Sequence, residues 1–162
     1  MTQFEIDDWG ISPGNSLQAM PDSRFGIAIC YDSEFSAGAL AQAERGVQAL
    51  CVPTYTETWH GFYRVRHCCL ARATEMQIFV IQASLVGSLG REPLPEAHGS
   101  AAILAPSVVP FPFDGVLAES ERDREGVAVA DLDFEALLLS RTQGDVRNWE
   151  DRRKGRWSYD QT

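Results

Sequence analysis

An alternation of apolar strands and amphipathic helices between residues 24 and 84 is the feature that most restricts how this chain can fold. Apolar runs typical of strands stand at Arg24–Tyr31, at Gln48–Pro53 and at 78–84, the last with the sequence IFVIQAS. Between them, residues 37–45 are rich in Ala, Leu and Gln, and Gly61–Gln77 repeats apolar residues at helical spacing. This alternation predicts a layered α/β fold, with helices covering a sheet.

The second half of the chain predicts further strands and one more helix. Three short apolar runs, SAAILAP, GVLAES and GVAVADLD, are separated by turn residues and are typical of strands. A last helix is expected over Phe134–Leu139, with Asp133 as its N-cap. Residues 144–162 are polar and are expected to form a C-terminal tail outside the main body. The length of 162 residues predicts a single domain.

Charge and cysteine content argue against several classes of protein. The formal net charge is −9 and the pI is about 4.7, whereas nucleic-acid surfaces depend on clustered Lys and Arg. No run approaches the roughly 18 apolar residues of a membrane span, and the N-terminus does not read as a secretory signal. The four cysteines suggest no disulfide framework, and no Cys or His spacing indicates a metal site. We therefore expect a cytoplasmic protein with no metal, no other cofactor, and no membrane or nucleic-acid partner.

Cys30 is the residue with the most informative setting. A free cysteine inside a strand is usually a small buried hydrophobe. Cys30, however, ends an apolar strand and is followed at once by polar and bulky residues, in RFGIAICYDSEF. A nucleophile at a strand end can use the backbone N–H groups that follow it against an oxyanion. The three histidines, His60, His67 and His98, stand in ordinary settings, and no local signature makes any of them the base of a Cys/His hydrolase.

The segments around Cys30 resemble the nitrilase superfamily, the carbon–nitrogen hydrolases. The order and spacing of several motifs carry the resemblance, which runs from Thr2 to about Arg153. Those motifs are GIAICYDSEF, ERGVQALCVPTYTET, RVRHCCLARATEMQIFVIQASLVGS, HGSAAILAPS with FPFDGVLAES, and GVAVADLDFEAL. CYDSEF and RVR are most similar to the branch that is often fused to an acetyltransferase domain.

The resemblance implies a fold, a chemistry and a set of site residues. The fold would be part of an α-β-β-α sandwich that pairs through its helices with a second copy, giving a homo-oligomer. The chemistry would be attack of a cysteine on a small-molecule amide or nitrile, followed by hydrolysis of the thioester by water. Cys30 matches the nucleophile, the backbone N–H of Tyr31 an oxyanion donor, and Glu5 and Glu34 supporting acids. The substrate pocket would be lined by Thr54, Tyr55, Thr56 and Glu57.

The resemblance also implies residues that have no counterpart in this sequence. The family uses a Glu base and a Lys beside its cysteine, whereas the only lysine here is Lys154. We therefore expect residues 1–162 to form a carbon–nitrogen hydrolase-like domain that is incomplete at its N-terminus, with the first strands and helices of the sandwich missing. The isolated chain is expected to be weak or inactive as an amidase. The alternatives are a non-catalytic half-domain that acts in assembly or partner binding, and a thiol-based redox or acyl-carrying protein.

Overall fold

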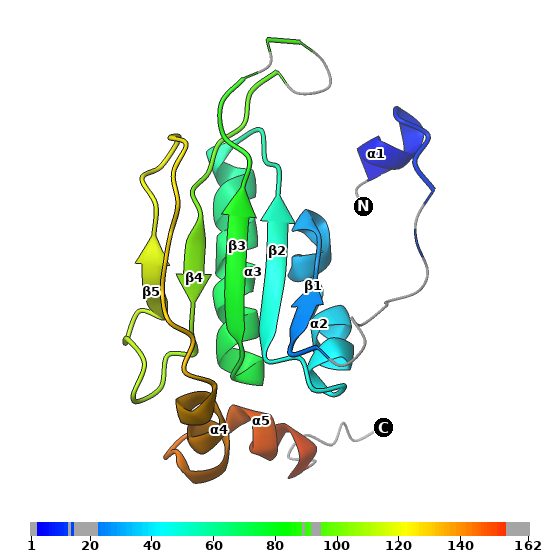
Figure 1. The fold of residues 1–162 in the computed structure, drawn as a ribbon. Coiled ribbons are helices and arrows are strands. Elements are labelled where there is room, and N and C mark those ends of the chain that lie inside the picture. The colour runs from blue at the N-terminus through cyan, green and yellow to red at the C-terminus, as the bar shows by residue number, and fades with distance from the viewer. Residues whose placement is uncertain (1–2, 13, 15–22, 89, 92–94, 155–162) are drawn as a thin grey trace.

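A five-stranded mixed sheet forms the centre of the molecule (Figure 1). The computed structural model describes residues 3–12, 14, 23–88, 90–91 and 95–154. The strands lie in chain order, with the first three parallel to one another and the last two antiparallel to their neighbours. They are β1 (Phe25–Ile27), β2 (Ala49–Thr54), β3 (Phe79–Ser84), β4 (Ala102–Leu104) and β5 (Val116–Glu119). The α/β class expected from the alternation is confirmed.

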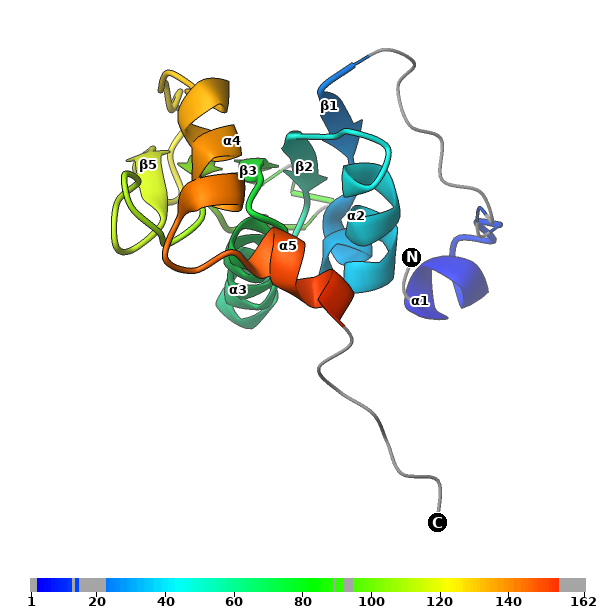
Figure 2. The same ribbon diagram turned by 90° about the horizontal axis from the view of Figure 1, so that it is seen from below.

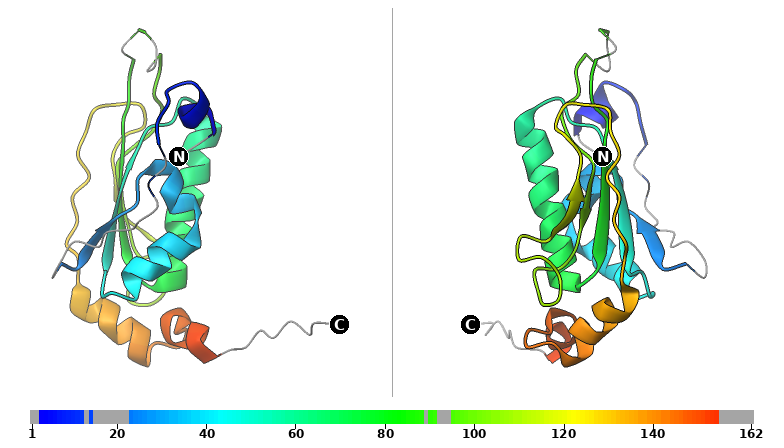
Figure 3. Two further views of the ribbon diagram at one scale, coloured as in Figure 1. Left: turned by 90° about the vertical axis from the view of Figure 1, so that its right-hand side faces the viewer. Right: turned by 60° about the vertical axis from the view of Figure 1, so that its left-hand side comes forward.

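Helices α2 and α3 lie together on one face of this sheet, as Figures 2 and 3 show. In chain order the helical elements are α1 (Gln3–Asp7), the 3-10 turn η1 (Cys30–Glu34), α2 (Ser36–Ala43), α3 (Trp59–Met76), α4 (Phe134–Gln143), α5 (Asn148–Asp151) and η2 (Arg152–Lys154). We call the face beneath α2 and α3 the covered face, and the opposite face the open face.

The long helix α3 follows from its apolar stripe and its N-cap. The Thr58 hydroxyl accepts a hydrogen bond from the Gly61 N–H at 3.1 Å, which satisfies one of the amides left unpaired at a helix start. The predicted stripe is confirmed, because each of its members is at most 1% exposed: Phe62, Val65, Cys69, Ala73 and Met76. Four of these side chains, Val65, Cys69, Ala73 and Met76, belong to the main core, which also contains Leu50, Val52, Val80 and Leu104 of the covered face.

Strand β1 is shorter than the predicted strand and lies at the edge of the sheet. It ends at Ile27, three residues before Cys30. The buried Gln42 of α2 bonds the free backbone edge of Ile27, accepting from its N–H and donating to its carbonyl, both at 3.0 Å. Gly26 permits this approach, because a Cβ at that position would collide with the Gln42 amide oxygen. The side chain of Gln42 thus replaces a neighbouring strand.

The segment GVAVADLD is not a strand, which corrects the sequence prediction. Residues 126–133 run extended without joining the sheet, and Val127 and Val129 are 83% and 80% exposed. β-Branched residues favour extended backbone, but a strand also needs a partner to bond. The predicted cap is confirmed, since the Asp133 carboxylate accepts from the Ala136 N–H at 2.8 Å and starts α4.

The segment from residue 144 differs from the expected tail, because the part that the structure describes packs on the main body. Asn148 donates to the Thr74 carbonyl at 3.1 Å, and the Trp149 N–H donates to Gln77 at the same distance. The last carbonyls of a helix need donors from outside the helix, and the end of α3 receives them here. Residues 155–162 lie outside the described part. Within the described residues, no helix combines the length and apolar character needed to cross a membrane.

Candidate active site

The backbone at Cys30 adopts a left-handed conformation directly after the end of β1. Its φ angle is 46°, and η1 begins at this residue. A left-handed backbone costs a non-glycine residue roughly 1–2 kcal/mol and is common where structure serves a reaction. The chain therefore leaves the sheet before Cys30, which stands at the start of the turn. This geometry favours a positioned thiol over a cysteine that only fills the core.

Two side chains from η1 hold this turn. The Asp32 carboxylate accepts from the Ile29 N–H at 3.2 Å, and the Ser33 hydroxyl donates to the Cys30 carbonyl at 2.7 Å. The Asp32 N–H also donates to the Ile29 carbonyl at 2.9 Å. Short polar side chains commonly bond nearby backbone in this way and stabilise tight turns. Sequence reasoning did not single out Ser33 or Asp32, although their positions two and three residues after Cys30 suit such bonds.

The thiol of Cys30 is half-buried against the segment that follows β2. Its Sγ donates to the Tyr55 carbonyl at 3.3 Å. Burial raises the pKa of Cys30, backbone hydrogen bonds from Tyr55 and Tyr31 oppose that rise, and the charges of Glu5 and Glu34 add to it. A hydrogen bond that favours the charged form of a thiol lowers its pKa. The backbone of Tyr31 has this effect on Cys30, and its role as an oxyanion donor stays a prediction.

An ion pair with α3 fixes Glu34, the predicted supporting acid. Arg64 Nε donates to both carboxylate oxygens of Glu34, at 2.8 and 2.9 Å. This bond raises the pKa of Arg64. The Glu34 side chain is only 12% exposed, whereas that of Arg64 is 54% exposed. Arg64 was not predicted as a site residue, and its separation of 30 positions from Glu34 gives no local signal.

In the predicted pocket segment, residues 54–57, buried and more exposed side chains alternate. Thr54 donates to the Ser84 hydroxyl at 3.1 Å, and Thr56 donates to the His98 carbonyl at 3.0 Å. Both threonines are buried, so they anchor the segment to the body of the protein. Tyr55 and Glu57 bond each other, with 3.0 Å between the Tyr55 hydroxyl and the Glu57 carboxylate. Of the four residues, these two have the exposure to meet a ligand.

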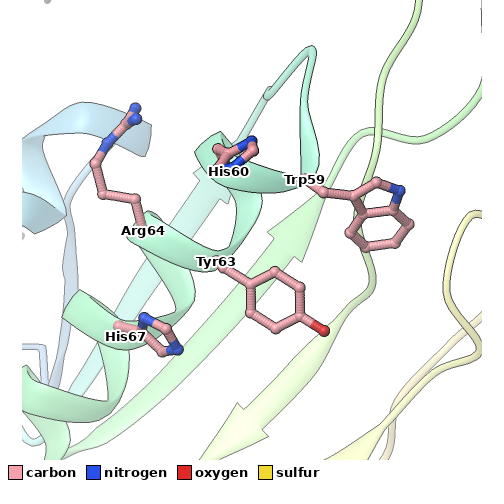
Figure 4. A pocket seen from close by; sticks show the side chains of 5 residues that line it. All are labelled: Trp59, His60, Tyr63, Arg64 and His67. Carbon is pink, nitrogen blue, oxygen red and sulfur yellow. The ribbon is translucent and has the colours of Figure 1, made fainter.

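The histidines lie in two other environments. His98 Nδ1 lies 3.1 Å from an Asp123 carboxylate oxygen, and its ring stacks on Trp59 with 5.3 Å between centroids. His60 and His67 face a hollow of about 440 Å³ on the outer side of α3 (Figure 4). That hollow is also lined by Trp59, Tyr63 and Arg64. Figure 4 shows the Arg64 side chain directed away from the Tyr63 ring, toward η1.

The chemistry available at this site is that of a thiol with backbone donors. All four cysteines are free. Among the described residues, no group of three or more His, Cys, Asp or Glu side chains could hold a metal ion. The turn brings together the Cys30 thiol, the backbone of Tyr31, and the carboxylates of Glu34 and Asp32, which are held by an ion pair and by a hydrogen bond.

Several known proteins are similar to this chain in sequence or in fold. The chain is 36% identical over 157 residues to the probable hydrolase YhcX of Bacillus subtilis (strain 168), a match that covers 95% of this chain and 31% of that protein. It is 30% identical over 135 residues to the human omega-amidase NIT2, covering 82% of this chain and 46% of that one. Its fold matches Saccharomyces cerevisiae Nit3, a member of branch 10 of the nitrilase superfamily, with a TM-score of 0.67 and 26% identity.

Each match covers most of this chain but less than half of the other protein. The structural match covers 81% of this chain and 46% of Nit3, so the chain spans less than half the length of each of the three proteins. The nitrilase-like α/β fold expected from the motifs is confirmed. Residues 5–141 match the model of the carbon-nitrogen hydrolase family. The chain therefore belongs to the carbon-nitrogen hydrolase family.

Proposed function

We propose that this chain carries the nucleophile of an amidase-type carbon–nitrogen hydrolase, and that the nucleophile is Cys30. The observation that supports the proposal is the left-handed turn at Cys30, whose thiol is half-buried and has the rise of its pKa opposed by a backbone hydrogen bond of Tyr31. The thiolate attacks the amide carbon and forms a C–S bond. The C–N bond then breaks, and the nitrogen leaves with a proton as ammonia or an amine. Water hydrolyses the thioester, releases the acid and restores the thiol.

The surrounding residues support this chemistry in distinct roles. The Tyr31 N–H stabilises negative charge first on the sulfur and then on the oxyanion of the tetrahedral intermediate. The Glu34–Arg64 pair ties the turn to α3. Tyr55 and Glu57 line the entrance, while Thr54 and Thr56 hold their segment in place. A relative named an omega-amidase favours amides over nitriles as the substrate class. Hydrolysis of an amide through a thioester needs no cofactor.

Deprotonation of Cys30 limits what the chain achieves by itself. Burial and the nearby carboxylates raise the pKa of the thiol, so little thiolate is present at neutral pH. General-base catalysis contributes roughly 10²–10⁴-fold to a rate, and an oxyanion donor about as much. The sequence offers no lysine near Cys30, since Lys154 is its only one. The residues of this chain alone are therefore expected to hydrolyse amides slowly or not at all.

The test compares the chain, the chain extended by a segment that carries the family's Glu and Lys, and variants of both on a panel of small amides. We expect turnover by the extended protein, loss of that turnover in Cys30→Ala, and retention in the matched control Cys51→Ala. Mass-spectrometric mapping after brief alkylation of the native protein should show Cys30 modified ahead of the other three thiols. Turnover that survives in Cys30→Ala would reject the assignment of the nucleophile.

We also propose that the protein is a cytoplasmic homo-oligomer that associates through the outer side of α3. The hollow there exposes the rings of Trp59 and Tyr63 beside two histidines, and exposed aromatic side chains are typical of interfaces. The four free thiols suit a reducing compartment. Sedimentation at micromolar concentration should show a dimer or larger species that Tyr63→Glu weakens, whereas Glu75→Gln, farther along α3, should leave it intact. A stable monomer would contradict the proposal.

A further inference from the structure

Ser33 is fully buried, and its hydroxyl is committed to a single backbone group. It is 0% exposed within η1, and its Oγ donates to the carbonyl of Cys30 at 2.7 Å. This is an ordinary length for a hydroxyl donor, and the bond closes the turn that gives Cys30 its left-handed φ of 46°. The acceptor belongs to the peptide unit that joins Cys30 to Tyr31. The N–H at the other end of that unit is the donor proposed above for the thiol and its oxyanion.

A peptide unit is planar, so fixing one end of it fixes the other. The carbonyl of Cys30 and the N–H of Tyr31 point in opposite directions in one plane. A hydrogen bond to the carbonyl therefore sets the direction in which the N–H points. It also polarises the unit, and hydrogen bonds in such a chain strengthen one another. Both effects act on the Tyr31 N–H, the backbone group whose hydrogen bond opposes the rise in the pKa of Cys30.

Helix α3 packs against this turn beside Ser33. Its Cys69 side chain lies close to Ser33 and is 0% exposed. Burial raises the pKa of Cys69 to about 12, so at neutral pH Cys69 is a protonated thiol and a weak acceptor. The Ser33 hydroxyl therefore stays bonded to the carbonyl of Cys30.

We propose that Ser33 is a positioning residue that fixes the plane of the Cys30–Tyr31 peptide, and through it the direction of the Tyr31 N–H toward the thiol and its oxyanion. The inference rests on the proposed role of Cys30 and adds a residue that the motif comparison did not assign. Ser33 touches neither substrate nor sulfur of Cys30; it acts through the backbone.

The experiment measures the rate of Cys30 alkylation by iodoacetamide from pH 6.5 to 10.5, with peptide mapping, in the native chain and in Ser33 variants. Loss of the Ser33 bond should weaken the N–H donation that favours the thiolate. We expect Ser33→Ala to alkylate Cys30 about tenfold more slowly at pH 7, with rates that converge at high pH, where the thiolate is fully formed. Ser33→Thr, which keeps the hydroxyl, should restore most of the rate. Ser36→Ala, an exposed serine three residues away, should match the wild type.

The outcomes separate this inference from the proposed function. An alkylation profile in folded Ser33→Ala that matches the wild type at every pH would overturn the role of Ser33. Circular dichroism verifies folding, and if Ser33→Ala is unfolded, Ser33→Cys decides. That variant keeps the shape with a weaker donor, so an intermediate rate supports the role and an unchanged rate rejects it. In the extended protein, kcat should fall with KM unchanged. Turnover that persists in Cys30→Ala would reject the nucleophile while leaving the alkylation profile of Ser33→Ala as it is.

Discussion

The two faces of the sheet are built from the same strands and differ in what lies on them. On the covered face, Leu50 and Val80 are 0% exposed beneath α2 and α3. On the open face, Ile27 and Ile29 are 45% and 59% exposed, and Leu85, just beyond β3, is 48% exposed. Only part of the open face is packed, where Leu137 of α4 joins Ala49 and Phe79. Both faces are apolar, so composition does not reveal which one is covered.

This difference shows where the molecule still has apolar surface to bury. Soluble monomers rarely expose large contiguous apolar patches, and such patches usually mark a binding surface. The α-β-β-α sandwich implied by the motifs would place a second sheet against the open face. That arrangement stays a prediction. It would bury the open-face side chains in a core, as α2 and α3 bury those of the covered face.

The largest expected effect comes from truncating matched aliphatic residues on the two faces. Leu50→Ala should lower the free energy of unfolding by about 2–5 kcal/mol, because it leaves a cavity in a fully packed core. Ile27→Ala should lower it by less than about 1 kcal/mol, because Ile27 is already partly in water. Urea unfolding of both variants measures the difference. Equal losses would mean that the open face is packed as tightly as the covered one.

The thiols of Cys69 and Cys51 sharpen the comparison at alkaline pH. Burial raises the pKa of Cys69 from an ordinary 9.0 to about 12 in the folded chain. Above pH 9 the unfolded chain loses this proton before the folded chain does, so the free energy of unfolding falls by about 1.4 kcal/mol per pH unit. Cys69→Ala should remove the part of the slope due to this proton, and a smaller slope should remain because the pKa values of Cys30, Cys51 and Cys68 are also raised. Cys51→Ala on the open face should leave most of the slope. Denaturant titrations at pH 8 and 10.5 test this, and an unchanged slope in Cys69→Ala would contradict it.

Native labelling of the same two thiols should give a smaller and more direct contrast. Cys51 is half-buried on the open face and Cys69 is 0% exposed on the covered one. A bulky maleimide should therefore modify Cys51 at least about tenfold faster than Cys69 under native conditions. Peptide mapping after timed quenching measures both rates, and urea-unfolded protein serves as the control in which they should become similar. Faster labelling of Cys69 in the native chain would show that α3 does not hold the covered face shut.

The smallest expected effect concerns the charge of Glu34 beside Cys30, the proposed nucleophile. The charge of Glu34 adds to the raised pKa of Cys30, so Glu34→Gln should lower that pKa and speed alkylation at pH 7 by no more than about threefold. Glu57→Gln, whose carboxylate is bonded to Tyr55, serves as the control on the neighbouring segment. A slower reaction in Glu34→Gln would show that the loosened turn, and not the lost charge, dominates at this site.

Periodicity predicted the elements that have a covered face. The stripe on α3 and the strands β2 and β3 were evident because apolar spacing reports burial against a helix layer. The end of β1 was predicted to lie four residues too late, because apolar residues continue to Ile29 while the backbone already turns. The strand predicted for GVAVADLD was wrong for a related reason. Its residues favour extended backbone, but that preference does not supply a partner strand. The packing of α5 depends on hydrogen bonds to the end of α3, where Asn148 donates to the Thr74 carbonyl. No local sequence pattern indicates such a distant bond.

The candidate site was predictable only in part. Cys30 could be singled out because it ends a strand before polar residues. The contacts of the turn could not be predicted, since Tyr55 bonds Cys30 from 25 positions away and Arg64 bonds Glu34 from 30 positions away, and no short motif links them. The direction of the Thr54 and Thr56 side chains likewise depends on Ser84 and His98, two distant partners.

The outer edge of β1 determines how copies of this chain can meet. Its outward amides at Phe25, Ile27 and Ile29 are each taken by a side chain, from Ser23, Gln42 and Asp32. An unpaired strand edge is a template on which a second chain can add a strand and begin a fibril. Here each of these three amides already has a hydrogen-bond partner, so it cannot bond an added strand. The chain is thus expected to resist amyloid-like growth from β1, and Gln42→Leu, which frees Ile27, is the change most suited to allow it.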